Sequence, residues 1–287
     1  MSDIVGTPLA VPVPVARRRR GGRGLLILGS VMAFVLLAIV VAGPWLAPYP
    51  AELTSPQSLA GPSAEHLLGT DSIGRDVLSR MIIGGRATLS ITVIAVVLAL
   101  LIGAILGLLA GYLGGAVDQA IMRVLDVLFA FPAFLLAVAV VAALGPTIPN
   151  LILTIAIVYT PSMARVVRGP VLSVKRWDHV EAARSVGLSE FRIATRHILP
   201  MVVSPILVET SLMLSRAIFT ITALSFLGLG PPPPDPNWGG ELSSGRQFME
   251  LAPMNVIAPA AAIVFATLTF IVLANGLRDR FDVAGQR

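Results

Sequence analysis

Three polar side chains stand in an otherwise apolar stretch of the chain. Glu209, Arg216 and Thr220 are spaced by seven and four residues, so they share one face of a helix. A charge at the centre of a membrane span costs about 2.5–3.5 kcal/mol, so Arg216 must face water or a partner group. Glu209 and Arg216 are about 10 Å apart along a helix axis, which predicts that they do not pair directly. These residues either line a translocation cavity or form structural pairs with another helix.

A second group of residues has side chains that can bind metals. His66, Asp71 and Asp76 are of ligand type, but their spacing shows no clear geometry for a third ligand. We expect these charges instead to pair with each other, or with a partner subunit, at the outer surface. The sequence has no G-x-x-x-x-G-K-[ST] phosphate loop, no H-E-x-x-H motif and no plausible Ser/His/Asp arrangement. It therefore predicts a non-catalytic chain that binds no metal or cofactor and cannot hydrolyse ATP alone.

The composition indicates an integral membrane protein. Of the 287 residues, 55% are hydrophobic and 13% are charged, whereas soluble domains carry about 25% charged residues. There is no cysteine, so no disulfide holds any loop and no thiol chemistry is available. The net charge of +5 follows the segments that flank the apolar stretches and is not gathered in one groove. This distribution excludes nucleic acid as a partner and makes membrane lipid the expected surroundings.

The apolar stretches predict an all-α protein with six transmembrane helices, since about 20 apolar residues are enough to cross a bilayer. We expect these helices at residues 25–46, 88–110, 124–144, 151–159, 200–229 and 256–277. Phe131-Pro132 predicts a kink in the third helix, and Pro161 is expected to close the short fourth helix. Gly103 and Gly107 form a small-xxx-small pair that favours close helix packing.

Basic residues set the expected orientation, because cytoplasmic segments carry an excess of Lys and Arg. With both termini inside, most of the 21 basic residues fall in inner segments. The outer segments then hold only Arg75, Arg80, Arg86 and Arg246. The sequence therefore predicts a multi-pass protein of the cytoplasmic membrane with both termini in the cytoplasm.

The longest polar segment between apolar blocks covers residues 177–200 and reads as two short helices joined by a tight turn. Asp178 can cap the first helix, with Glu181 completing a capping box. Gly187 then ends that helix, because a left-handed backbone is cheapest for glycine. Ser189 can cap the second helix, and Pro200 follows where the chain becomes apolar again.

This segment resembles the EAA loop of the membrane subunits of bacterial ABC importers. The resemblance rests on Glu181-Ala182-Ala183, on Gly187, and on the hydrophobic-Leu-Pro ending at Leu199 and Pro200. It implies that these six residues belong to a cytoplasmic coupling helix, within a loop at 165–197, that sits in a groove of an ATPase subunit. The alternative for the same residues is a capped amphipathic helix pair that lies on the membrane surface.

Two further segments resemble the C-type permease subunits of dipeptide and oligopeptide importers. They are the string HLLGTD…GRDVLSR within residues 66–80 and the string SFLGLG at 225–230, which is followed by a Pro-rich stretch and NWG. The resemblance implies the type I permease fold of ABC importers. It also implies four kinds of component outside this chain: a homologous second permease subunit, two cytoplasmic ATPase subunits, the ATP and Mg that those subunits hold, and an extracytoplasmic binding protein.

The expected domain organisation follows from these segments. It consists of a disordered cytoplasmic N-terminus (1–24), the first helix with an outer connector (25–86), a transmembrane permease domain (87–280) and a cytoplasmic tail (281–287). The expected function is ATP-driven, binding-protein-dependent import of dipeptides or oligopeptides. Two alternatives remain, which are import of nickel or another small solute by the same branch, and a secondary transporter or channel that works alone. Related permeases often carry Glu where Ile221 stands and lack the Glu209/Arg216 pair, so the substrate is not carried over from the resemblance.

Overall fold

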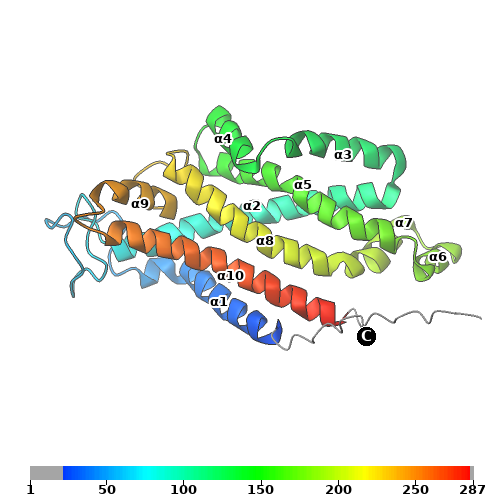
Figure 1. Cartoon of the computed structure of the whole chain (residues 1–287), viewed down its shortest axis with the longest axis horizontal. Helices are drawn as coiled ribbons and strands as arrows, with labels where there is room; N and C mark the ends of the chain where they lie inside the picture. Colours follow the sequence, from blue (N-terminus) through cyan, green and yellow to red (C-terminus); the bar gives the residue numbers. More distant parts are fainter. Residues whose placement is uncertain (1–21, 285–287) are drawn as a thin grey trace, which may run out of the picture.

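The computed structural model describes residues 22–284, so the expectations for residues 1–21 and 285–287 lie outside the described part. That part is almost entirely helical and, apart from two isolated bridges, has no β-pairing (Figure 1). The helices in chain order are α1 (Gly22–Leu46), α2 (Val77–Leu113), α3 (Gly115–Phe129), α4 (Ala133–Leu144), α5 (Ile148–Val174), α6 (Asp178–Ser185), α7 (Glu190–Ile193), η1 (Ala194–Ile198), α8 (Leu199–Phe226), α9 (Trp238–Gly245), η2 (Arg246–Phe248) and α10 (Met254–Ala284).

Within the described residues, five helical stretches are long and apolar enough to cross a membrane. They are α1, α2, α5, α8 together with the short elements before it, and α10. The pair α3 and α4 makes a sixth if it is one span, although the two helices are bent by 86°. The all-α fold with six predicted spans is thus confirmed, and the third span is broken.

The bend between α3 and α4 has a local cause in the sequence. Pro132 is the N-cap of α4 and has an extended backbone, with φ −55° and ψ 127°. Proline has no N–H to donate, and its ring disfavours a helical conformation at Phe131 before it. The predicted kink at Phe131-Pro132 is confirmed, and it is large enough to turn α4 away from the axis of α3 (Figure 1).

The predicted fourth span, 151–159, was wrong in both length and end point. Helix α5 runs from Ile148 to Val174 and contains Pro161 and Pro170 in its interior. Interior prolines are tolerated in membrane helices where neighbouring helices and side chains compensate for the lost hydrogen bond. The residues of α5 are the most buried of the candidate spans, so packing holds this helix through both prolines. The expected cytoplasmic loop 165–197 consequently starts only after Val174.

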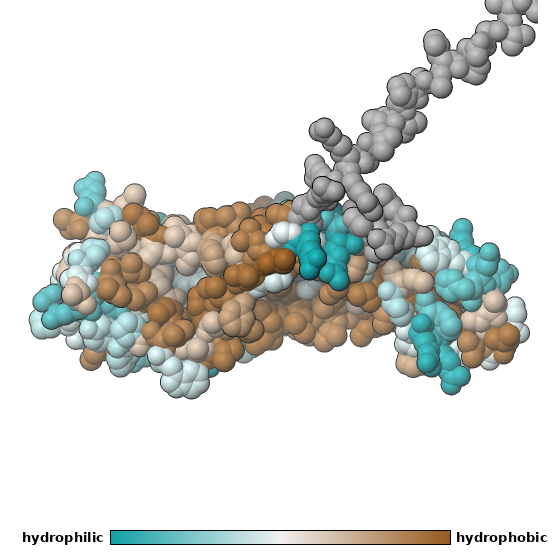
Figure 2. Space-filling view, turned by 90° about the horizontal axis from the view of Figure 1, so that it is seen from below, coloured by the Kyte–Doolittle hydropathy of each residue, from teal (hydrophilic) through white to brown (hydrophobic). Residues whose placement is uncertain are grey.

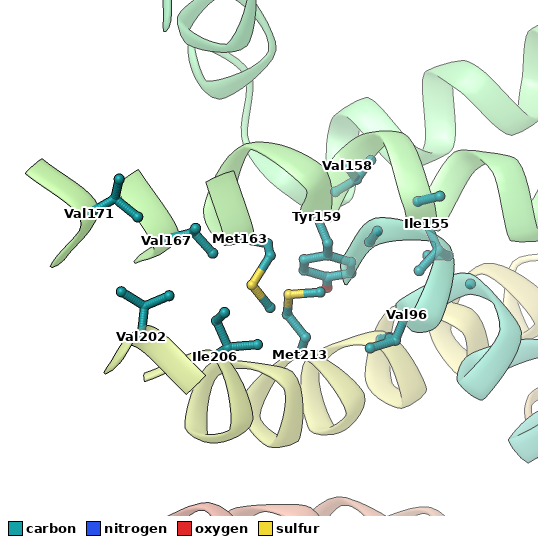
Figure 3. Packing of buried hydrophobic residues seen from close by; sticks show 14 of the residues in the cluster. Val96, Ile155, Val158, Tyr159, Met163, Val167, Val171, Val202, Ile206 and Met213 are labelled. Atoms are coloured by element: carbon teal, nitrogen blue, oxygen red, sulfur yellow. The ribbon is translucent and has the colours of Figure 1, made fainter. Parts of the chain in front are cut away.

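A row of glycines lets α2 lie directly against α5. A Cβ at Gly103, Gly107 or Gly111 would come within 2.7, 2.4 or 2.8 Å of atoms in α5. The predicted small-xxx-small packing is confirmed, with Gly111 as a third member one turn further on. Figure 3 shows the packing of α5 on α8, where Met163 and Val167 lie towards Ile206 and Met213 of α8. The same figure places Val96 of α2 beside this cluster.

The molecule is an elongated bundle with different chemistry along its length. Figure 2 shows an apolar belt between two more polar ends. The start of α1, the end of α10 and the α6–α7 region lie towards one end, while α9 and the connector between α1 and α2 lie at the other (Figure 1). Helix α6 projects beyond the ends of α1 and α10. The connector is longer than a turn, and α2 begins at Val77, where the side chain of Asp76 accepts a hydrogen bond from the backbone N–H of Ser79, rather than at residue 88.

Candidate coupling surface and translocation face

The turn after α6 has the geometry that the sequence predicted. Gly187 has φ +80°, the left-handed region that favours glycine. Its N–H donates to the carbonyl of Arg184 at 3.0 Å, and the N–H of Leu188 donates to the carbonyl of Ala183 at 3.2 Å. These two bonds form a Schellman motif, which satisfies carbonyls at the end of α6 and turns the chain.

The predicted capping box at the start of α6 is not formed. Trp177 occupies the N-cap position and makes no capping hydrogen bond through its side chain. Asp178 is instead the first helical residue, and Glu181 lies in the first turn. Both carboxylates remain favourable there because the N-terminal end of a helix carries partial positive charge. Ser189 is the N-cap of α7, but its side chain makes no capping bond either.

Helix α6 has one buried side and one uncovered side. Val180 and Ala183 are buried in the main apolar cluster of the bundle. Glu181 and Ala182 are exposed. Large apolar side chains are also uncovered around this helix, namely Trp177, Val186 at 77% exposure and Phe191 at 80%. This surface, which we call the α6 surface, consists of Trp177, Glu181, Ala182, Val186 and Phe191.

The second helix of the polar segment is not the separate short helix that the sequence predicted. Helix α7 continues through the π-helical turn η1 into α8, so one helical stretch runs from Glu190 to Phe226. Leu199 and Pro200, the end of the EAA-like motif, form the start of α8 and follow directly on the π-helical turn η1. The α6 surface is therefore connected to a membrane-spanning helix by the single turn at Gly187.

Side chains tie the α6–α7 region to the spans around it. Lys175 Nζ donates to the carbonyl oxygen of Gly111 at the end of α2 at 2.7 Å. The hydroxyl of Tyr112 donates to the carboxylate of Glu190. Further along, Arg168 Nε of α5 donates to Asp118 Oδ1 of α3 at 2.5 Å. The first two contacts link the α6–α7 region to the end of α2, and the third links α5 to α3. They were not visible in the sequence because the partners are 50 or more residues apart.

On α8, the structure corrects the expectation that Glu209 and Arg216 do not pair. Arg216 Nη2 lies 2.5 Å from Glu209 Oε1. Helical side chains lean towards the N-terminus, so the long Arg216 side chain reaches back over two turns to the carboxylate. Ser162 of α5 also donates to Glu209 Oε1, at 2.7 Å. Ser162 was not predicted, because the fourth span was expected to end at residue 159, before it.

The third residue of the predicted face has a different environment. Thr220 is buried, and its hydroxyl is hydrogen-bonded to the Tyr159 hydroxyl at 2.9 Å and to the carbonyl of Arg216 at 3.0 Å. By contrast, the Arg216 side chain is 47% exposed and that of Glu209 is 12% exposed. The three residues share one side of α8, but only Arg216 presents a substantial surface.

Two cavities lie along this side of α8. One has a volume of about 190 Å³ and is lined by Arg216, by Tyr159 and Ser162 of α5, and by residues around the bend between α3 and α4. The other has a volume of about 330 Å³ and is lined by Glu209 together with residues of α5, α8 and α10. The Glu209–Arg216 pair therefore lies between two hollows that follow each other along the helix. We call this side of α8 the translocation face, after the translocation cavity that the sequence predicts there as one of two alternatives.

At the opposite end, the residues considered as metal ligands form polar contacts with each other. His66 Nδ1 lies 2.9 Å from Asp76 Oδ1, and Arg75 Nε lies 2.6 Å from Asp71 Oδ2. The expected pairing of these charges is confirmed. Residues 22–284 contain no group of three or more His, Cys, Asp or Glu side chains arranged to hold a metal ion.

Comparison with known proteins places the whole arrangement in a family. The family model described as "Binding-protein-dependent transport system inner membrane component" matches residues 103–284. The glutathione transport system permease protein GsiD of Shigella flexneri serotype 5b (strain 8401) is 48% identical over 253 residues, which are 87% of this chain and 84% of that protein. The proteins of the same name from Escherichia coli O6:K15:H31 (strain 536 / UPEC) and Shigella boydii serotype 4 (strain Sb227) are 47% identical over the same shares.

The family match covers more than half of the chain, and it extends from the second half of α2, through the α6 surface and the translocation face, to the end of α10. The helical fold and the apolar belt agree with that match. The chain belongs to the family of binding-protein-dependent transport system inner membrane components, as a multi-pass permease subunit of an ABC importer.

Proposed function

We propose that this permease subunit imports dipeptides or oligopeptides across the cytoplasmic membrane, driven by ATP hydrolysis in partner subunits. In this proposal the chain pairs with a homologous second permease subunit, two cytoplasmic ATPase subunits and an extracytoplasmic binding protein. Both termini and α6 face the cytoplasm, in agreement with the basic residues of those segments. The peptide class is supported by relatives whose name specifies glutathione, which is itself a tripeptide.

The α6 surface is the observation that carries the coupling role. Trp177, Val186 and Phe191 are exposed on this surface. Helix α6 lies at a polar end of the molecule, beyond the ends of α1 and α10 (Figures 1 and 2). Uncovered aromatic and apolar side chains in a polar setting are typical of a protein interface. Glu181 and Ala182, which carry the resemblance to the EAA loop, lie on the same surface.

The connection from α6 into the membrane supports the same role. A displacement of α6 passes through the Gly187 turn into the continuous helix that becomes α8, and α8 carries Arg216. Lys175 and the Tyr112–Glu190 contact pass it to α2 as well. We propose that closure of the ATPase subunits on ATP moves α6, and that this motion opens the translocation face alternately to each side of the membrane.

A cross-linking experiment on the assembled transporter tests this function. A photoreactive label on Val186→Cys, in a chain without native cysteine, should cross-link to an ATPase subunit, and the yield should change when ATP is added. The same label on Leu53→Cys, an exposed apolar position in the connector at the opposite end, is the control and should give no such product. Uptake that persists without the ATPase subunits would overturn the proposal in favour of a transporter that works alone.

The substrate is tested separately from the coupling. Mass spectrometry of the small molecules that co-purify with the partner binding protein should identify peptides. Reconstituted vesicles should then accumulate such a peptide only when binding protein, both permease subunits, ATPase subunits and ATP are present. Recovery of a metal ion or a non-peptide solute, with no peptide accumulation, contradicts the peptide assignment while leaving the coupling role intact.

A further inference from the structure

The cavity at the bend between α3 and α4 combines an apolar wall with one charged group. Phe129, Phe131 and Leu136 line it from the bend, and Arg216 lines it from α8. Its volume of about 190 Å³ is below the roughly 300–1,000 Å³ of pockets that enclose a whole drug-sized ligand. It therefore suits one part of a ligand rather than a complete oligopeptide.

The charge that lines this cavity is positive, because Arg216 of the Glu209–Arg216 ion pair lines the cavity and Glu209 does not. Glu209 is largely covered, and its Oε1 accepts from both Ser162 and Arg216. Arg216 is half exposed, and its Nε donates to the carbonyl of Leu212 at 3.3 Å. Among residues 22–284, the Nη1 donors of Arg216 have no hydrogen-bond partner, although a guanidinium can donate five hydrogen bonds.

The ion pair also fixes where those free donors are. The bond from Arg216 Nη2 to Glu209 holds one edge of the planar guanidinium against α8, so the remaining donors keep a defined place beside the cavity. A guanidinium in such a place matches a carboxylate, which can accept two parallel N–H bonds from it. Glu209 therefore positions the guanidinium of Arg216.

We propose that Arg216 binds the carboxylate of a peptide in transit, while the adjoining apolar side chain of the peptide lies against Phe129, Phe131 and Leu136. This inference rests on the proposed function, in that it takes a peptide as the transported solute. It assigns part of the substrate selection to the membrane subunit, at the cavity between α3, α4, α5 and α8, in addition to any selection by the binding protein.

Protection of a single cysteine from labelling tests the proposal without the binding protein. Phe131→Cys lines the cavity and is the only cysteine of this chain, so a polar thiol reagent reports access to the cavity. The probes are a tripeptide of three leucines and its C-terminal amide, added to the assembled transporter. We expect the carboxylate form to slow labelling about tenfold at a concentration where the amide slows it less than about twofold. This corresponds to an affinity about tenfold higher for the carboxylate form, or roughly 1.4 kcal/mol in binding free energy.

Variants of the arginine and a distant cysteine complete the test. Arg216→Gln should remove the difference between the two peptides, whereas Arg216→Lys should retain part of it because the charge remains. Leu53→Cys in the connector should label at the same rate with either peptide. If Arg216→Gln does not assemble, the comparison of the two peptides on the otherwise unmodified transporter still decides, since equal protection by both overturns the inference.

The failures of the two proposals have different signatures. Uptake of trileucine by the unmodified transporter, with equal protection by the carboxylate and the amide, overturns the role of Arg216 and leaves peptide import standing. The absence of any ATP-dependent uptake of trileucine or of other peptides, with no protection by either form, overturns peptide import and the inference with it.

Discussion

The two ends of the molecule differ in whether their side chains are paired within the chain or exposed to solvent. At the end formed by the connector and α9, Arg80 is 3% exposed, donates to Glu241 Oε1 at 2.5 Å and donates to the carbonyl of Ala51 at 2.9 Å. Trp238 is buried as well and donates to the carbonyl of Met81 at 2.9 Å. These contacts join the connector, α2 and α9 into one structure whose polar groups are paired internally.

The end that carries α6 and α7 leaves charged and apolar side chains exposed. Its ion pair, Arg184 Nε with Glu190 Oε1 at 3.2 Å, is formed by side chains that are 49% and 59% exposed. Val186 and Phe191 are uncovered beside that pair. A region whose polar groups are hydrogen-bonded within the chain stabilises the fold. A region that exposes apolar side chains to water is expected to bury them against a partner protein. Four changes test this comparison, and they are ordered by expected effect.

The first change removes a charge from each end. Arg80→Ala leaves Glu241, whose side chain is 14% exposed, without its partner, which costs up to about 3–5 kcal/mol, the range for a buried pair. Arg184→Ala removes one side of an exposed pair, which costs about 0–1 kcal/mol. Thermal unfolding of the purified protein in detergent should show a large loss for the former and almost none for the latter. Equal losses would mean that the two ends are not built differently.

The second change uses two glycines with nearly the same backbone conformation. Gly74 in the connector has φ +84° and Gly187 has φ +80°, so a valine is strained at both positions by about 1–2 kcal/mol. A Cβ at Gly74 would lie 2.1 Å from the carbonyl oxygen of Ser55, whereas a Cβ at Gly187 meets nothing within 4 Å.

Gly74→Val should therefore reduce the amount of folded protein in the membrane. Gly187→Val should be inserted at near-normal levels but should lose uptake, because the angle between α6 and α7 changes. Immunoblotting of membranes and uptake assays give the two readouts. Normal uptake by well-inserted Gly187→Val protein would count against this turn as the coupling element.

The third change addresses the uncovered apolar side chains directly. Phe191→Ser removes an 80% exposed aromatic ring, so the stability of the isolated subunit should not fall. Its affinity for the ATPase subunits should fall about tenfold, equivalent to about 1.4 kcal/mol. Co-purification at graded salt and detergent measures this loss. Leu53→Ser, an exposed apolar position in the connector at the opposite end, is the control and should leave ATPase binding unchanged.

The fourth change concerns a group beside α9 that departs from the internal pairing found at that end. Ser225 Oγ, at the end of α8, is the one buried side-chain oxygen or nitrogen of residues 22–284 that has no hydrogen-bond partner. Ser225→Ala removes the unsatisfied oxygen, and the expected change is from zero to about 1 kcal/mol of added stability. A loss of several degrees in the unfolding midpoint would show that this hydroxyl has a partner in the assembled transporter.

Local chemistry in the sequence was sufficient for several features. Composition and apolar length predicted the helical membrane class, because the bilayer imposes both on any spanning chain. Pro132 predicted the bend, because proline restricts its own backbone and that of the residue before it. Gly187 predicted the turn, because glycine readily adopts the positive φ that the turn requires. Gly103 and Gly107 predicted close packing, because a missing side chain is itself the geometric requirement.

The features that only the tertiary structure decided depend on groups far apart in sequence. Pro161 did not end α5, because burial against α2 and α8 outweighs the local preference. The axial distance between Glu209 and Arg216 predicted separation, yet the reach of the arginine side chain joins them. Ser162 and the bend between α3 and α4 reach Arg216 only through folding, because no spacing rule connects residues on four different helices.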